Sequence, residues 1–313
     1  MSALIEGELL ERLERLSLVS RRRLAGHGKG DRRSIRKGTS IEFVDYRHYT
    51  PGDDPRQVDW NIFRRSGNLY VKQFEDEEVL TAHVLVDVSS SMDWGSPSKG
   101  EYAARLAAAL GYIILAGASR LVVGTLAGPT TQTFGPAWGR RQLSGLMGFL
   151  EPGTSRGSRV PSPASGSPLG TRDPRPATRS LTDLDAALGS YARRAEPGLA
   201  VVITDLLTPK FEIGLKRLLD RRFEVILLHV LAPEEVHPPM SGDLTLIDRE
   251  DGSEVAITVN QEAIDRYQAR FRSWTGAIES FSARHGILYL RIQTGERLEH
   301  VLFDRLRRRG VLR

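Results

Sequence analysis

Hydrophobic and polar positions along most of the chain follow two periods in turn, and this alternation predicts strands separated by helices. Short apolar runs with the length of buried strands occupy residues 82–87, 199–205, 223–231 and 287–292. Segments with helical spacing or length occupy residues 98–118, 140–150, 184–194, 210–221, 261–283 and 296–309. Such alternation predicts an α/β fold of the doubly wound type, with a mainly parallel sheet covered on both faces.

Turn residues predict two hairpins in addition to the parallel strands. The first joins residues 121–126 to 131–134 through Gly128 and Pro129. The second, a small additional β-hairpin, joins 244–248 to 255–259 through Asp251 and Gly252.

The N-terminal part has a different pattern. Apolar residues at helical spacing within 4–18 predict an amphipathic helix on the main body, and residues 40–74 have the pattern of short strands and turns. We therefore expect residues 1–78 to pack on a main domain of residues 79–313. Within that domain, residues 152–178 are rich in Pro, Gly, Ser and Arg, which predicts a disordered insertion.

Composition narrows the function classes. The chain has no cysteine, so disulfides and thiolate metal sites are excluded. The net charge is only +5, and the basic groups lack interleaved aromatic residues, so we expect no nucleic-acid partner. No secretory signal and no apolar run of membrane-spanning length is present, which favours a cytoplasmic protein.

Oxygen-bearing side chains stand at the ends of the predicted strands. Asp87 ends the run at 82–87 and is followed by Ser89 and Ser91. Asp205 ends the run at 199–205, and Thr182 precedes a predicted helix. Oxygen donors without nitrogen or sulfur suit a hard cation such as Mg²⁺, with Mn²⁺ as an alternative. Each hydroxyl could instead cap a helix, and each aspartate could hold loop amides.

The three motifs together resemble the metal ion-dependent adhesion site of the von Willebrand factor A superfamily, which has a Rossmann-like fold. From about Arg21 onward the chain more closely resembles the bacterial domain of unknown function 58 family. The residues that carry this likeness are Ser40, Glu42, Phe43, Arg47, Tyr49, Pro51, Gly52, Asp53, Asp54, Arg56, Asp59 and Trp60, then Val71 to Glu75 and the Asp87 motif.

The resemblance implies roles for the site residues and a partner. Ser89, Ser91 and Thr182 would contact the metal directly, and Asp87 and Asp205 would act directly or through water. The family implies that the protein works with a MoxR-type AAA+ ATPase, or with another protein that offers an acidic ligand.

The block from Tyr46 to Trp60, which is dense in charged and aromatic residues, can form a charge network over packed aromatic rings. The network would pair Arg47, Asp53, Asp54, Arg56 and Asp59. Together with Glu42 before the block, the residues that we expect to have a structural or partner-binding role are Glu42, Arg47, Tyr49, Gly52, Asp53, Asp54, Arg56, Asp59 and Trp60. We favour a clasp that holds the N-terminal segment on the main domain over a partner-recognition surface.

Two functions compete at this level. The first is a non-enzymatic, metal-dependent protein-binding adaptor. The alternative is a metal-dependent, phosphatase-like hydrolase that uses Asp87 as its nucleophile, but this chemistry usually needs a second acid two residues on, where Ser89 stands, and a nearby lysine. The histidines are scattered and show no ligand spacing.

Overall fold

The computed structural model describes residues 4–5, 7–20, 42–53, 55–75, 80–117, 119–127, 130–151, 183–239, 242–247 and 254–313. The chain divides into a large unit, residues 1–23 and 80–313, and a small unit, residues 24–79. The N-terminal helix α1 (Gly7–Leu13) thus belongs to the large unit, which differs from the expected division after residue 78. Its apolar face, including Leu9 and Leu13, joins the core of the large unit.

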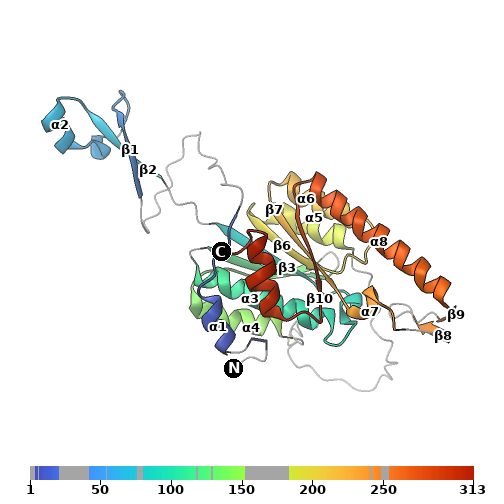
Figure 1. Ribbon diagram of the computed structural model, residues 1–313. Coiled ribbons are helices and arrows are strands. Elements are labelled where there is room, and N and C mark those ends of the chain that lie inside the picture. The colour runs from blue at the N-terminus through green and yellow to red at the C-terminus, as the bar shows by residue number, and fades with distance from the viewer. Residues whose placement is uncertain are drawn as a thin grey trace, which may run out of the picture. The chain divides into compact units, whose positions relative to one another are not determined.

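The large unit is built on a six-stranded sheet (Figure 1). The strands are β3 (Thr81–Asp87), β4 (Arg120–Ala127), β5 (Thr130–Ala137), β6 (Leu199–Thr204), β7 (Glu224–Leu231) and β10 (Leu288–Gln293). Their order is β10-β7-β6-β3-β4-β5, and every neighbouring pair is parallel except β4 and β5. The predicted mainly parallel sheet is confirmed, and so is the hairpin that adds β5 at its edge.

Helices cover both faces of this sheet (Figure 1). One face carries α1, α3 (Lys99–Ala116), α4 (Leu143–Leu150) and the helical segment His300–Leu306, and the other carries α5 (Leu184–Arg194), α6 (Phe211–Asp220) and α8 (Gln261–Arg284). In β6, Val201 and Ile203 enter the first core and Val202 the second, which is the alternation expected of a strand between two layers.

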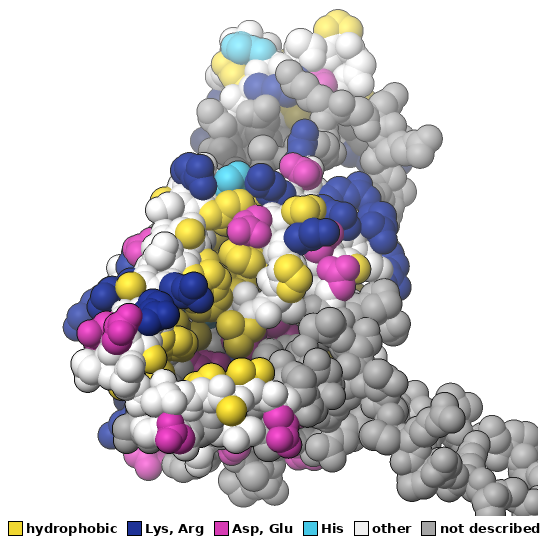
Figure 2. All heavy atoms as spheres, turned by 90° about the vertical axis from the view of Figure 1, so that its right-hand side faces the viewer, with side chains coloured by type: hydrophobic (Ala, Val, Ile, Leu, Met, Phe, Trp, Pro, Cys, Tyr) yellow, Lys and Arg dark blue, Asp and Glu magenta, His cyan; other side chains and the backbone are white. Residues whose placement is uncertain are grey.

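Short elements complete the large unit. They are the 3-10 turns η2 (Ser90–Asp93) and η3 (Arg140–Gln142), the helix α7 (Pro233–Val236), and the antiparallel strands β8 (Gly242–Ile247) and β9 (Glu254–Val259), which form the second predicted hairpin. Seen from the side on which β8 and β9 lie, hydrophobic side chains gather in a hollow between groups of Lys and Arg (Figure 2). Within the described residues, no helix is long and apolar enough to cross a membrane.

The small unit pairs β1 (Glu42–His48) with β2 (Tyr70–Glu75) and carries the turn η1 (Pro55–Gln57) and the helix α2 (Trp60–Ser66). The helix was not predicted. Asp59 caps it by accepting hydrogen bonds from the backbone N–H groups of Asn61 and Ile62, at 2.9 and 3.2 Å. The expectation that Trp60 packs beneath a charge network is wrong, because this first helical residue is 57% exposed and meets Phe63 edge-on.

Several predictions fall on residues that the structure does not describe. They include the insertion at 152–178, Asp54 and the metal-ligand candidate Thr182, together with the side chain of Glu42. The expected packing of the segment after residue 23 on the main domain stays a prediction.

Candidate metal centre

The candidate centre lies where the strand order of the sheet reverses. From β3 the chain continues to β4 on one side, whereas β6 lies on the other side of β3. Ligands of open α/β sheets bind at such a switch point, beyond the carboxyl ends of the strands. Asp87 is the last residue of β3, and Thr204 is the last residue of β6, directly before Asp205.

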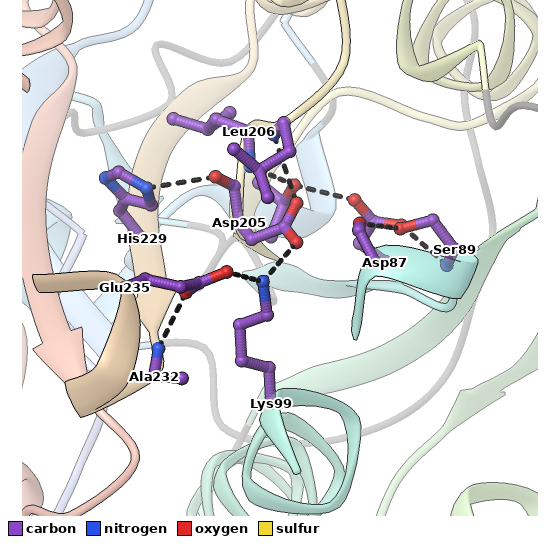
Figure 3. A network of polar contacts seen from close by, with 11 residues as sticks. Asp87, Ser89, Lys99, Asp205, Leu206, His229, Ala232 and Glu235 are labelled. Carbon is purple, nitrogen blue, oxygen red and sulfur yellow. Dashed lines mark hydrogen bonds and ion pairs between the residues drawn. The ribbon is translucent and has the colours of Figure 1, made fainter. Parts of the chain in front are cut away.

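A hydrogen bond between side chains joins the two strand ends (Figure 3). The Thr204 hydroxyl donates to Oδ2 of Asp87 at 2.7 Å, and Oδ1 of Asp87 accepts from the backbone N–H of Ser89 at 2.9 Å. Asp87 is 1% exposed and Thr204 is fully buried. Asp87 and Asp205 are therefore held next to each other at the same rim of the sheet.

Ser89 and Ser91 present their hydroxyl groups together, with the two Oγ atoms 3.0 Å apart. Ser89 stands at the N-cap position of η2, but its side chain makes no capping hydrogen bond. The alternative role of a helix cap therefore does not account for Ser89. Before α5 the cap is Asp183, whose carboxylate accepts from the N–H of Ala186 at 3.0 Å.

Asp205 is fully buried and is held by its backbone as well as by its side chain. Oδ1 accepts from the N–H of Leu207 at 3.1 Å, across Leu206, whose φ of 56° lies in the left-handed region. A non-glycine residue in that region stores strain of about 1–3 kcal/mol, which the surrounding structure must hold. Such strain is common where a side chain is positioned for binding.

His229 fixes the backbone carbonyl of Asp205, with Nε2 at 3.0 Å from the oxygen. Because a carbonyl only accepts, Nε2 carries the proton and Nδ1 accepts from the hydroxyl of Tyr289 at 2.8 Å. Burial lowers the pKa of His229 to about 4, so the ring is neutral at ordinary pH. This ring contributes orientation to the centre and no charge.

Lys99 and Glu235 belong to the same cluster, although the sequence did not point to them. The ammonium group of Lys99 donates to Oδ2 of Asp205 at 2.7 Å and to Oε1 of Glu235 at 2.5 Å. The other oxygen of Glu235 accepts from the N–H of Ala232 at 2.8 Å. One sequence signal existed: Lys99 opens α3, and a cation is disfavoured at the positive end of a helix dipole.

Buried carboxylates give this rim of the sheet an excess of negative charge. Burial raises the pKa of Asp87 to about 6, and the negative charge of Asp205 adds to the rise. With all groups ionised, the three carboxylates of Asp87, Asp205 and Glu235 outnumber the single ammonium of Lys99 and leave two net negative charges. A divalent cation would relieve this repulsion.

The donor chemistry fits such an ion. Asp87, Ser89, Ser91 and Asp205 offer only oxygen, as Mg²⁺ and Mn²⁺ prefer. Within the described residues no three His, Asp or Glu side chains are grouped to hold a metal, so an ion here depends on the serine hydroxyls. Thr182, the remaining predicted ligand, lies outside those residues.

In the small unit, the structure brings together Arg47 and Asp53. The guanidinium group of Arg47 donates to both carboxylate oxygens of Asp53, at 2.6 and 2.7 Å, and Gly52 takes the positive φ of 110° that the turn needs. Asp59, by contrast, caps α2 and accepts from the Tyr46 hydroxyl at 3.1 Å. Tyr49 is held by its backbone, because its N–H donates to the carbonyl of Leu69 at 2.9 Å.

Fold and site together define a doubly wound α/β protein with an oxygen-lined, acidic centre at its switch point. Residues 45–277 match the family described as "Protein of unknown function DUF58", and the chain belongs to this family. Uncharacterized proteins of Mycobacterium bovis and Mycobacterium tuberculosis are each 30% identical over 248 residues, which cover 78% of this chain and 72% of theirs.

Two solved structures are similar at a lower level. The conserved hypothetical protein BatB from Bacteroides thetaiotaomicron has a TM-score of 0.40 at 18% identity, over 68% of this chain and 90% of its own. An aerotolerance-related membrane protein from Bacteroides fragilis has a TM-score of 0.40 at 19% identity, over 68% and 91% of the two chains. A likeness at this level does not define a function.

Proposed function

We propose that this protein is a non-enzymatic, metal-dependent protein-binding adaptor, and that its centre is an adhesion site of the von Willebrand factor A type. The observation that carries the proposal is the convergence of Asp87, Ser89, Ser91 and Asp205 at the switch point. The hydrogen bond from Thr204 to Asp87 holds the two halves together.

In this proposal the hydroxyls of Ser89, Ser91 and Thr182 contact Mg²⁺ or Mn²⁺ directly, and the carboxylates of Asp87 and Asp205 act directly or through water. Hydroxyl ligands are neutral, so a bound ion keeps much of its charge. An acidic side chain of a partner would then complete the coordination. The partner that we propose is a MoxR-type AAA+ ATPase, in assembly, chaperone-like or regulatory work.

The surroundings of the centre support binding to a protein. Trp94 follows η2 and is 42% exposed, and Leu207, two residues after Asp205, is 52% exposed. Exposed aromatic and aliphatic side chains beside a charged group are the usual composition of an energetically important contact region. A partner could thus bury apolar surface around its acidic ligand.

The hydrolase alternative has weaker support. Both oxygens of Asp87 already accept hydrogen bonds and the residue is 1% exposed, which is unsuited to attack on a phosphoryl group. Lys99 supplies the nearby lysine that this chemistry needs, but it pairs with Asp205 and Glu235.

Affinity capture from the native cytosol tests the proposal. We expect the wild-type protein to retain a MoxR-type ATPase in Mg²⁺ and to lose it in EDTA, and we expect Asp87→Ala to retain none in either condition. Asp220→Ala, which removes an exposed aspartate at the end of α6, serves as the matched control. Equal recovery with and without EDTA would contradict metal dependence. Mg²⁺-stimulated hydrolysis of p-nitrophenyl phosphate that is lost in Asp87→Ala would instead favour the enzyme.

A further inference from the structure

Lys99 is a fully buried cation at the acidic centre. Figure 3 shows its side chain reaching from α3 toward Asp205 and Glu235, with Asp87 and Ser89 on the other side of Asp205. Removing an ammonium group from water costs several kcal/mol, as a general rule, unless close carboxylates offset the loss. Asp205 and Glu235 provide this compensation, each through a direct ion pair.

The ion pair with Asp205 places Lys99 in competition with any metal ion at the centre. Oδ1 of Asp205 accepts from the N–H of Leu207, and Oδ2 accepts from Lys99. A divalent ion that draws on the Asp205 carboxylate must therefore share its charge with the ammonium group or displace it. At an effective dielectric constant of about 20, two unit charges about 4 Å apart interact by about 4 kcal/mol, so this repulsion is large enough to control affinity.

Glu235 gives Lys99 a second carboxylate. It lies in α7, after β7, and its side chain is only 17% exposed. If Lys99 yields Asp205 to a metal ion, Glu235 can keep the ammonium group paired, so that no isolated charge remains in the interior.

We propose that the Lys99 ammonium is the resident cation of this centre, which competes with a divalent metal ion for Asp205 and is released onto Glu235 when the metal binds. The inference rests on the proposed metal-binding function. It adds that Lys99 keeps the affinity for metal low and that Glu235 raises it. Both are positioning residues, because neither is one of the proposed metal ligands.

The two residues predict changes of opposite sign. Lys99→Met removes the competing charge at similar side-chain length and is expected to bind Mg²⁺ or Mn²⁺ at least about tenfold more tightly. Glu235→Gln confines Lys99 to Asp205 and is expected to bind these ions about tenfold more weakly. Lys216→Met, an exposed lysine of α6, removes the same charge away from the cluster and should leave metal affinity unchanged.

The experiment is calorimetric titration of the full chain with Mg²⁺ and with Mn²⁺, with circular dichroism to show that each variant is folded. Asp87→Ala is included to show that the measured heat comes from this centre. Tighter binding in Lys99→Met together with weaker binding in Glu235→Gln supports the inference, and so does metal binding that appears only in Lys99→Met.

Other outcomes overturn it in ways that can be told apart. Equal affinity in the wild type and Lys99→Met overturns the role of Lys99 and leaves the metal site standing. Binding that survives Asp87→Ala, or no binding in any variant, overturns the metal site as well. Should Lys99→Met fail to fold, unchanged or tighter binding in Glu235→Gln alone overturns the inference.

Discussion

Asp87 in the large unit and Asp53 in the small unit make nearly the same local hydrogen bonds. Asp87 accepts from the N–H of Ser89 at 2.9 Å and the hydroxyl of Thr204 at 2.7 Å. Asp53 accepts from the N–H and the hydroxyl of Thr50, at 2.9 and 3.0 Å. Their pKa values nevertheless move in opposite directions.

The difference comes from burial and from the charge of the next neighbour. Burial and the carboxylate of Asp205 raise the pKa of Asp87 to about 6. The hydrogen-bonded guanidinium of Arg47 holds the pKa of Asp53 well below its usual range. The small-unit cluster is thus neutral and complete, whereas the large-unit cluster keeps a negative charge that a cation can satisfy. Similar hydrogen bonds therefore surround a balanced charge in one unit and an unbalanced charge in the other.

Removing the buried ammonium group of Lys99 should lower the free energy of unfolding more than any other change proposed here. Lys99→Met leaves Asp205 and Glu235 without their shared counter-ion, and loss of one partner of a buried ion pair costs about 3–5 kcal/mol. We expect the free energy of unfolding, measured by urea denaturation in EDTA, to fall by this amount. Mg²⁺ should restore part of it.

Arg47→Met is the matched control, because Arg47 is 41% exposed in its side chain and solvent screens its pair with Asp53. A Lys99→Met protein as stable as the wild type in EDTA would show that the buried pair does not differ from the exposed one.

The contributions of Asp87 and Asp53 to stability should change in opposite directions with pH. Because the pKa of Asp87 rises from 3.8 to about 6 on folding, its favourable contribution is present below about pH 4 and is lost as the pH rises through 6. A shift of about two units corresponds to about 3 kcal/mol. We expect the difference in unfolding free energy between wild type and Asp87→Asn to fall by up to this amount from pH 4 to pH 7, in EDTA.

Asp53→Asn should show the opposite trend, since a lowered pKa contributes stability above the unfolded value and loses it as the pH falls. If the difference in unfolding free energy between wild type and Asp87→Asn stays constant between pH 4 and pH 7, the pKa of Asp87 is not raised by burial and by Asp205.

The sequence predicts much of the fold and part of the candidate centre, but it does not predict the contacts of Lys99 and Glu235. The bounds of α5 were predicted without error, because its segment has clear helical spacing, although its cap is Asp183 and not a hydroxyl residue. The meeting of Asp87 with Asp205 was predictable too, since the carboxyl ends of parallel strands share one rim.

The pairing of Lys99 with Glu235 joins residues 136 positions apart, and nothing in the local pattern of either residue indicates the other. Helix α2 was missed for a different reason. Its seven residues have no buried side chain, so the apolar periodicity that marks a packed helix is absent. Only the cap residues Asp59 and Gly67 carried a signal.

Thr204→Val should lower the free energy of unfolding by an intermediate amount. The substitution keeps the shape of the side chain but removes the hydroxyl that donates to Asp87 and accepts from the N–H of Leu206 at 3.0 Å. A buried group left without its partner costs about 1–3 kcal/mol. We expect a loss in this range by urea denaturation, and Thr204→Ser should recover most of it. If serine does no better than valine, the loss does not come from the hydrogen bond between the hydroxyl and Asp87.

The smallest effect is expected from Asp59→Ala in the small unit. Asp59 is 7% exposed, nearly as buried as Asp87, but its carboxylate caps α2 through the N–H groups of Asn61 and Ile62 and has the Tyr46 hydroxyl as a further donor. Loss of such a cap costs about 1 kcal/mol, which corresponds to about fivefold faster hydrogen exchange in the first turn of the helix. Asp59→Asn keeps an oxygen acceptor and should exchange at nearly the wild-type rate. Should Asp59→Ala destabilise the protein as much as Lys99→Met, burial alone would explain both effects, and the unbalanced charge at the carboxyl ends of β3 and β6 would lose its special role.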